Sequence, residues 1–165
     1  YVPPLMAWIE RHPDIRLQWQ HLPLSMHEPA ASQLATLAEC AGEAGGPEAY
    51  WRTISWIYQH TRGEGQGLPD GVLHPSHEAL RACLAGERPL AIVRAQADGA
   101  AGNGIAATPT LHLRDERSGQ SLWLQGPIAG DALLSAMDLL VIDDPAIAPV
   151  DPTVLSAVPD GNKPR

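Results

Sequence analysis

Residues 104–113 read Gly-Ile-Ala-Ala-Thr-Pro-Thr-Leu-His-Leu, and the expected fold extends outward from this stretch. Pro109 has no backbone N–H to donate to a sheet, so it belongs at the start or the edge of a strand. Its ring pushes Thr108 into an extended conformation, and an X-Pro bond adopts the cis form at modest cost. The backbone N–H and C=O groups of Thr108 would then be free to pair with an extended peptide. Taken alone, a Thr-Pro pair at the start of a strand more often has only the structural role of separating a helix from a strand.

The residues after Pro109 predict a hairpin. Alternating polar and apolar residues indicate strands over 110–114 and 121–125, each with two leucines on one face. The polar turn 115–119 is long enough to join a hairpin but too short for a crossover helix, so the strands are expected to be antiparallel. Apolar residues then recur with a helical period from 129 to 142, which predicts a terminal helix.

The stretch from 29 to 103 is expected to be helical. Pro29, Pro47 and Pro89 stand where helices are expected to begin, and glycines follow where these helices are expected to end. Residues 62–75 are rich in glycine and proline and are therefore expected to form a loop.

The N-terminal part predicts one helix and one strand. Apolar residues at helical spacing follow the proline pair at 3–4, and a proline at position 13 ends this helix. Residues 15–21 then alternate between apolar and polar side chains, which predicts a strand whose apolar face carries Ile15, Leu17 and Trp19.

Two separate parts of the sequence resemble one family. The motif over 104–110, followed by a hairpin and a final helix, is similar to the C-terminal half of DsbA-like proteins. The sequence Cys-Ala-Gly-Glu over 40–43, followed by Tyr50-Trp51, resembles a second motif of that family. DsbA-like proteins are thiol-disulfide oxidoreductases, and the resemblance covers the chain from Tyr1 to about residue 142.

The resemblance implies an α/β chain with a thioredoxin-like fold and an inserted helical domain. The thioredoxin-like core would comprise residues 1–26 and 104–142, with its first strand missing from this sequence. Residues 27–103 would form the helical insertion, and 143–165 would be a Pro-rich tail that lacks regular structure.

The resemblance also implies an active site. In the family, the Thr-Pro bond is cis and lies beside a Cys-x-x-Cys pair at the start of the first helix, so this pair is expected just upstream of Tyr1. Thr108 and Pro109 would form the catalytic corner, and Ala107 and Thr108 would hold the substrate backbone. The expected activity is protein-disulfide exchange without a cofactor, on cysteine-containing proteins in the bacterial periplasm or another extracytoplasmic compartment, with a redox partner protein.

Two other functions fit the same residues. A redox-inactive thioredoxin-fold module would keep the peptide-binding corner without a dithiol. A relative of the kappa-class glutathione transferases and isomerases would share the fold and the insertion. The residues before Tyr1 would distinguish the three, because a Cys-x-x-Cys indicates the oxidoreductase, its absence the binding module, and a lone serine the transferase group.

Cys40 and Cys83 are the two cysteines of the sequence, and both fall inside helical patterns. A catalytic dithiol works at a helix N-terminus, where the dipole and the free N–H groups stabilise the thiolate, so neither cysteine is assigned the family's catalysis. They are either two buried small side chains or a structural disulfide of the helical block, which some relatives carry at similar places. The residues alone do not decide between these readings.

Other chemistries find little support. A net charge of −8 argues against a nucleic-acid partner. His74 and His77 lack a cysteine or an acidic partner at ligand spacing, so no metal site is expected. Ser25 and His27 lack the turn motif and the orienting acid of a hydrolase.

Overall fold

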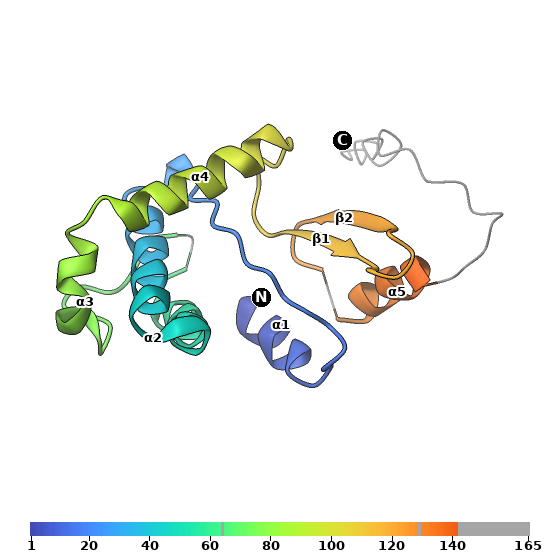
Figure 1. Cartoon of the computed structure of the whole chain (residues 1–165), viewed down its shortest axis with the longest axis horizontal. Helices are drawn as coiled ribbons and strands as arrows, with labels where there is room; N and C mark the ends of the chain where they lie inside the picture. The colour runs from blue at the N-terminus through green and yellow to red at the C-terminus, as the bar shows by residue number, and fades with distance from the viewer. Residues whose placement is uncertain (64, 129, 142–165) are drawn as a thin grey trace, which may run out of the picture.

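The computed structural model describes residues 1–63, 65–128 and 130–141 (Figure 1). In chain order the elements are α1 (Val2–Ile9), the short 3-10 helix η1 (Ser25–His27), α2 (Ala30–His60), α3 (His77–Leu84), α4 (Arg88–Gly102), β1 (Thr110–Arg114), β2 (Ser121–Gln125) and α5 (Gly130–Val141). The Pro-rich tail that the sequence predicts over 143–165 lies outside the described residues.

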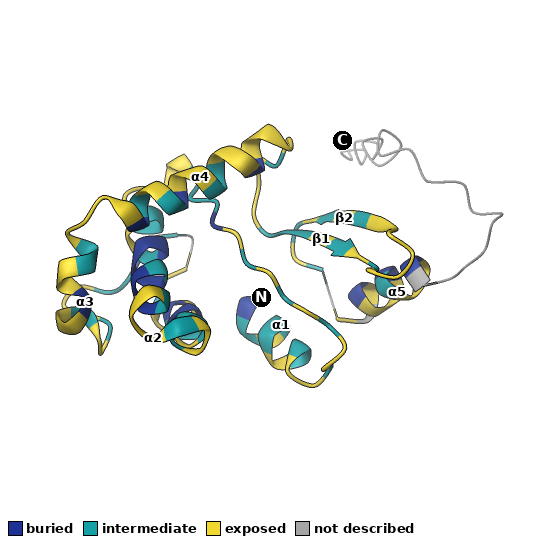
Figure 2. Cartoon of the chain, in the orientation of Figure 1, coloured by how far each residue is buried: buried dark blue, intermediate teal, exposed yellow. Residues whose placement is uncertain are grey.

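The helical block is centred on α2, which α3 and α4 both contact. Its core contains Leu37, Ala38, Ile54 and Leu80, and Figure 2 shows the buried residues gathered along α2. The two helices expected on either side of residue 46 form one helical run with a kink. Gly46 has a φ of 71° and a ψ of −168°, which is a conformation open essentially to glycine alone.

Helix α1 packs on the same block. Val2 is buried in its core, and the hydroxyl of Ser55 on α2 donates to the sulfur of Met6 at 3.6 Å. The helix that opens the sequence is therefore held by the helical block.

The hairpin forms as the sequence predicts. Strands β1 and β2 are antiparallel, with Leu111 opposite Leu124 and Leu113 opposite Leu122. These leucines are half-buried, and α5 contacts β2. On the other face, the rings of His112 and Trp123 stack with their centroids 4.1 Å apart. The alternation that predicted the strands thus separates a leucine face from a His-Trp face.

The strand predicted over 15–21 is not formed among the described residues. The segment runs extended from the end of α1 towards α4 (Figure 1), but no hydrogen bond joins the backbone of residues 16–20 to a described residue. The backbone of this segment is hydrogen-bonded to described residues only at its two ends, where the N–H of Ile15 donates to the C=O of His12 and the N–H of His21 donates to Oε1 of Gln96. A strand needs a neighbour at about 4.8 Å, and no strand of the described residues pairs with this segment.

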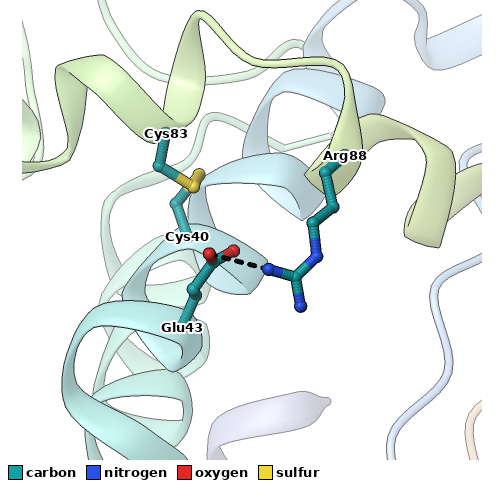
Figure 3. Close-up of a disulfide and its surroundings, with 4 residues drawn as sticks. All are labelled: Cys40, Glu43, Cys83 and Arg88. Carbon is teal, nitrogen blue, oxygen red and sulfur yellow. Dashed lines mark hydrogen bonds and ion pairs between the residues drawn. A yellow bond between two sulfur atoms is a disulfide. The ribbon is translucent and has the colours of Figure 1, made fainter.

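Cys40 on α2 and Cys83 on α3 form a disulfide, with their Cα atoms 5.8 Å apart (Figure 3). This settles the alternative left open by the sequence in favour of the bridge. Beside it, Arg88 at the start of α4 donates to Glu43 on α2 at 2.9 Å. The bridge and this ion pair together join α2, α3 and α4.

The disulfide is expected to stabilise the helical block by restricting the unfolded chain. For cysteines 43 residues apart, the chain-entropy model gives about 4 kcal/mol as an upper figure. Urea unfolding of the oxidised chain, compared with the chain in reductant, should therefore show a clear fall in the free energy of unfolding. The Cys40→Ala/Cys83→Ala double variant is the control, because reductant should leave its unfolding unchanged. Equal stability of the oxidised and reduced wild-type chains would contradict the expectation.

Candidate functional site

The corner expected to bind substrate lies where the chain leaves α4 and enters β1. Gly104 has a φ of 75°, which lets the chain turn sharply after the helix. The Thr108–Pro109 peptide bond is cis, as the resemblance implies. Ala107 and Thr108 are both exposed, so the corner faces solvent.

Hydrogen bonds fix the residues around Thr108 and leave Thr108 itself open. The hydroxyl of Thr110 donates to the C=O of Ala107 at 2.8 Å, and the N–H of Gly126 donates to the C=O of Pro109 at 2.8 Å. No hydrogen bond to a described residue uses the backbone N–H or C=O of Thr108. An exposed residue whose backbone N–H and C=O are not used by any described residue can pair with an incoming strand.

The described residues contain no thiol that could act at this corner. Cys40 and Cys83 are bonded to each other, and Cys40 is fully buried in the helical block. A buried sulfur in a disulfide has neither the accessibility nor the thiolate character that exchange requires. The structure thus brings Ala107, Thr108 and Pro109 together and keeps both cysteines apart from them, in the helical block.

A buried polar cluster, which no motif in the sequence predicts, lies where the extended segment meets the helical block. His21 is 6% exposed, and its Nε2 lies 3.1 Å from the hydroxyl of Tyr50 and 3.3 Å from Oε1 of Glu39. Nε1–H of Trp19 points to Nδ1 of His21 at 3.4 Å, and Nε2 of Gln96 donates to Glu39 at 3.3 Å. His21 falls on the same face of the 15–21 alternation as Ile15, Leu17 and Trp19. That alternation could have predicted that its side chain is buried.

Burial sets the protonation of this cluster. It lowers the pKa of His21 from 6.5 to about 4, so this imidazole is neutral at pH 7. Nδ1 accepts from Trp19, so the proton sits on Nε2 and points to the hydroxyl of Tyr50. Burial raises the pKa of Glu39, and burial together with the charge of Glu39 raises the pKa of Tyr50. The 3.3 Å contact between His21 and Glu39 at pH 7 is therefore not an ion pair.

The other residues weighed from the sequence form no site in the part of the chain that the structure describes. Nδ1 of His74 accepts from the N–H of Ser76, and its ring meets the ring of Trp56 at a right angle. No group of three or more potential metal ligands comes together in 1–63, 65–128 or 130–141. None of the described helices is long and apolar enough to cross a membrane.

Comparison with known proteins places this geometry in context. The chain is similar to the crystal structure of DsbA2 from Pseudomonas aeruginosa, with 41% sequence identity and a TM-score of 0.77. The similarity covers 87% of this chain and 81% of that chain. No model of a protein family matches the sequence, and no curated protein matches it.

His21 is expected to make the folded state less stable in acid. Between pH 6.5 and about 4 this histidine is protonated in the unfolded chain but not in the folded chain. The free energy of unfolding therefore decreases as the pH is lowered through this range. The shift corresponds to about 3 kcal/mol at most. Glu39 acts in the opposite direction, because its raised pKa favours the folded state once it is protonated.

Urea unfolding at several pH values between 7 and 4 measures this dependence. The free energy of unfolding of a His21→Gln variant should fall less steeply over that range than that of the wild type. A Gln33→Ala change at an exposed position of α2 is the control and should leave the slope unchanged. Equal slopes for wild type and His21→Gln would show that His21 does not titrate as its burial requires.

Proposed function

This chain belongs to the DsbA-like family of thioredoxin-fold proteins, and from that premise we propose that it exchanges disulfides with cysteine-containing proteins outside the cytoplasm. The observation that carries the proposal is the corner at 107–109. There Thr108 is exposed, and its backbone N–H and C=O make no hydrogen bond to a described residue. This is a place where an extended substrate can bind without displacing any existing pairing.

In this proposal the backbone of Thr108 pairs with the substrate. Its N–H donates to a substrate carbonyl, its C=O accepts from a substrate N–H, and Ala107 borders the same strip. Pro109 has no N–H of its own, so it cannot compete for the substrate's carbonyl groups. The corner would then hold the residues beside a substrate cysteine in an extended form.

The reacting sulfurs are proposed to belong to a Cys-x-x-Cys pair just before Tyr1. Such a pair would stand at the N-terminus of α1, where the dipole and the free N–H groups lower a thiol pKa. A thiolate of one protein attacks the disulfide of the other, a mixed disulfide forms, and the displaced sulfur leaves as a thiolate. A second thiolate then resolves the mixed disulfide, so that one protein ends as a dithiol and the other as a disulfide. A redox partner protein restores the starting state by exchanging two electrons with the pair.

The backbone of residues 16–20, which has no hydrogen bond to a described residue, supports the same arrangement. We propose that a strand preceding the Cys-x-x-Cys pair lies between this segment and the outer edge of β1. Residues 1–26 and 104–142 would then form the thioredoxin-like core, and residues 27–103 would be the helical insertion.

The Cys40–Cys83 bridge bears on location. Structural disulfides persist in oxidising compartments and are rare in the cytosol of most organisms. The bridge therefore supports a periplasmic or otherwise extracytoplasmic location, which is also where protein substrates acquire disulfides.

Oxidation of a reduced test protein examines the proposal directly. The 165-residue chain should be inactive, and a chain that includes the residues upstream of Tyr1 should be active, because exchange needs an accessible thiolate and a resolving sulfur. A Pro109→Thr variant of the longer chain should alter substrate release or redox behaviour at the corner while its unfolding by urea stays close to that of the parent.

Three outcomes would contradict this assignment. Turnover by the 165-residue chain that disappears in a Cys40→Ser variant would place the active site at the bridge. An inert longer chain without an upstream cysteine pair would favour the redox-inactive peptide-binding module, and an upstream lone serine would favour the kappa-class glutathione transferase group.

A further inference from the structure

A groove opens beside the polar cluster of His21, between the extended segment and α2. It has a volume of about 410 Å³ and is lined by the rings of Trp19, Tyr50 and Trp51 and by the polar side chains of Gln18, Glu39 and Gln96, among other residues. The aromatic residues are partly buried on one side and reach the groove on the other.

The rings that border the groove stand at right angles to one another. Trp19 and Trp51 have centroids 6.3 Å apart and an interplanar angle of 89°, and Tyr50 and Trp51 have centroids 5.5 Å apart at the same angle. The three rings therefore pack edge to face against one another, and all three line the groove. The negative face of a tryptophan or tyrosine ring attracts an organic cation within about 6 Å.

The charge in the groove is of one sign. Among the described residues that line it, Glu39 alone is ionisable at neutral pH, and no lysine or arginine is present. The side chain of Glu39 is 16% exposed, and its one ion-pairing neighbour in the described chain is His21, which burial keeps neutral at pH 7. Its carboxylate is therefore largely removed from water without a cation to balance it, an arrangement that a bound cation would relieve.

From these two features we infer that the groove binds an organic cation, a guanidinium or alkylammonium group, against Trp19 and Trp51 with its charge directed at Glu39. The same chemistry is offered by an arginine or lysine side chain of a bound polypeptide and by a small free cation. The site uses none of the residues at the Thr108–Pro109 corner, so it does not depend on disulfide exchange.

Titration of the 165-residue chain, followed by NMR through its tryptophan indole N–H signals, tests the inference. The probes are the peptide Ac-Gly-Arg-Gly-NH₂, the same peptide with neutral citrulline in place of arginine, and methylguanidinium chloride. The arginine peptide should shift the signals of Trp19 and Trp51 saturably and leave that of Trp123, on the hairpin, in place. The citrulline peptide should bind roughly tenfold more weakly or not at all, because it lacks the charge.

A substitution on the protein gives the matching evidence. Glu39→Gln keeps the shape of the side chain and its acceptor oxygen, and it should weaken binding of the arginine peptide by a similar factor. Glu78→Gln, the same change at an exposed position on α3, should leave binding unchanged. Equal affinity for the arginine and citrulline peptides, or unchanged binding by Glu39→Gln, would overturn the inference. The citrulline comparison decides the matter even if Glu39→Gln does not fold.

The third probe identifies the source of the cation. Tighter binding of the arginine peptide than of methylguanidinium would show that the groove takes a side chain together with its backbone. Equal affinity would show that it takes a small free cation. Failure of both cations to shift Trp19 and Trp51 would overturn the inference while leaving the proposed disulfide exchange untouched.

Discussion

Backbone hydrogen bonding is the constraint on which this structure depends. Strands β1 and β2 pair the backbone N–H and C=O groups along one edge of each strand, and α5 contacts β2. A hairpin of two strands is marginal by itself, since three or more strands or a packed helix are needed for independent stability. Residues 16–20 have the alternation of a strand and no ladder among the described residues. The proposed first strand would give that segment and β1 the partner that both lack.

In the proposed function, the structural disulfide and the reacting sulfurs would be separated in space and in purpose. Cys40 is fully buried, and its bridge to Cys83 stands beside the Glu43–Arg88 pair, so it joins three helices of the insertion. Thr108, where the substrate is proposed to bind, is exposed and lies away from both cysteines. A stable bridge in the helical block and a labile one near the corner would let exchange proceed without loosening the insertion that α1 packs against.

Local signals predicted most of the elements. Pro89 places the start of α4 within one residue, and the leucine alternation gives both strands with their observed bounds. The cis bond at Pro109 and the Cys40–Cys83 bridge also agree with expectation. The prediction of a strand over 15–21 was wrong for the described chain, because alternation reports which side chains are buried and says nothing of whether a partner strand is present.

What the sequence could not show depends on contacts between distant residues. His21 and Gln96 lie 75 positions apart, and Tyr50 and Glu39 reach the same cluster from two different turns of α2. No short-range sequence pattern predicts a contact between such distant residues. The burial of the neutral histidine and the groove beside it could therefore be found only in the structure. The second cis peptide bond, Glu28–Pro29, likewise had no local signal that the sequence analysis used.

The central claim, that 15–21 and β1 flank one missing strand of a single sheet, can be tested by amide hydrogen exchange. The measurement compares the 165-residue chain with a chain that includes the residues upstream of Tyr1. The account predicts fast exchange for residues 16–20 in the shorter chain and slow exchange for them, and for the amides of β1 that face away from β2, in the longer one. Equally fast exchange of these amides in both chains would contradict it.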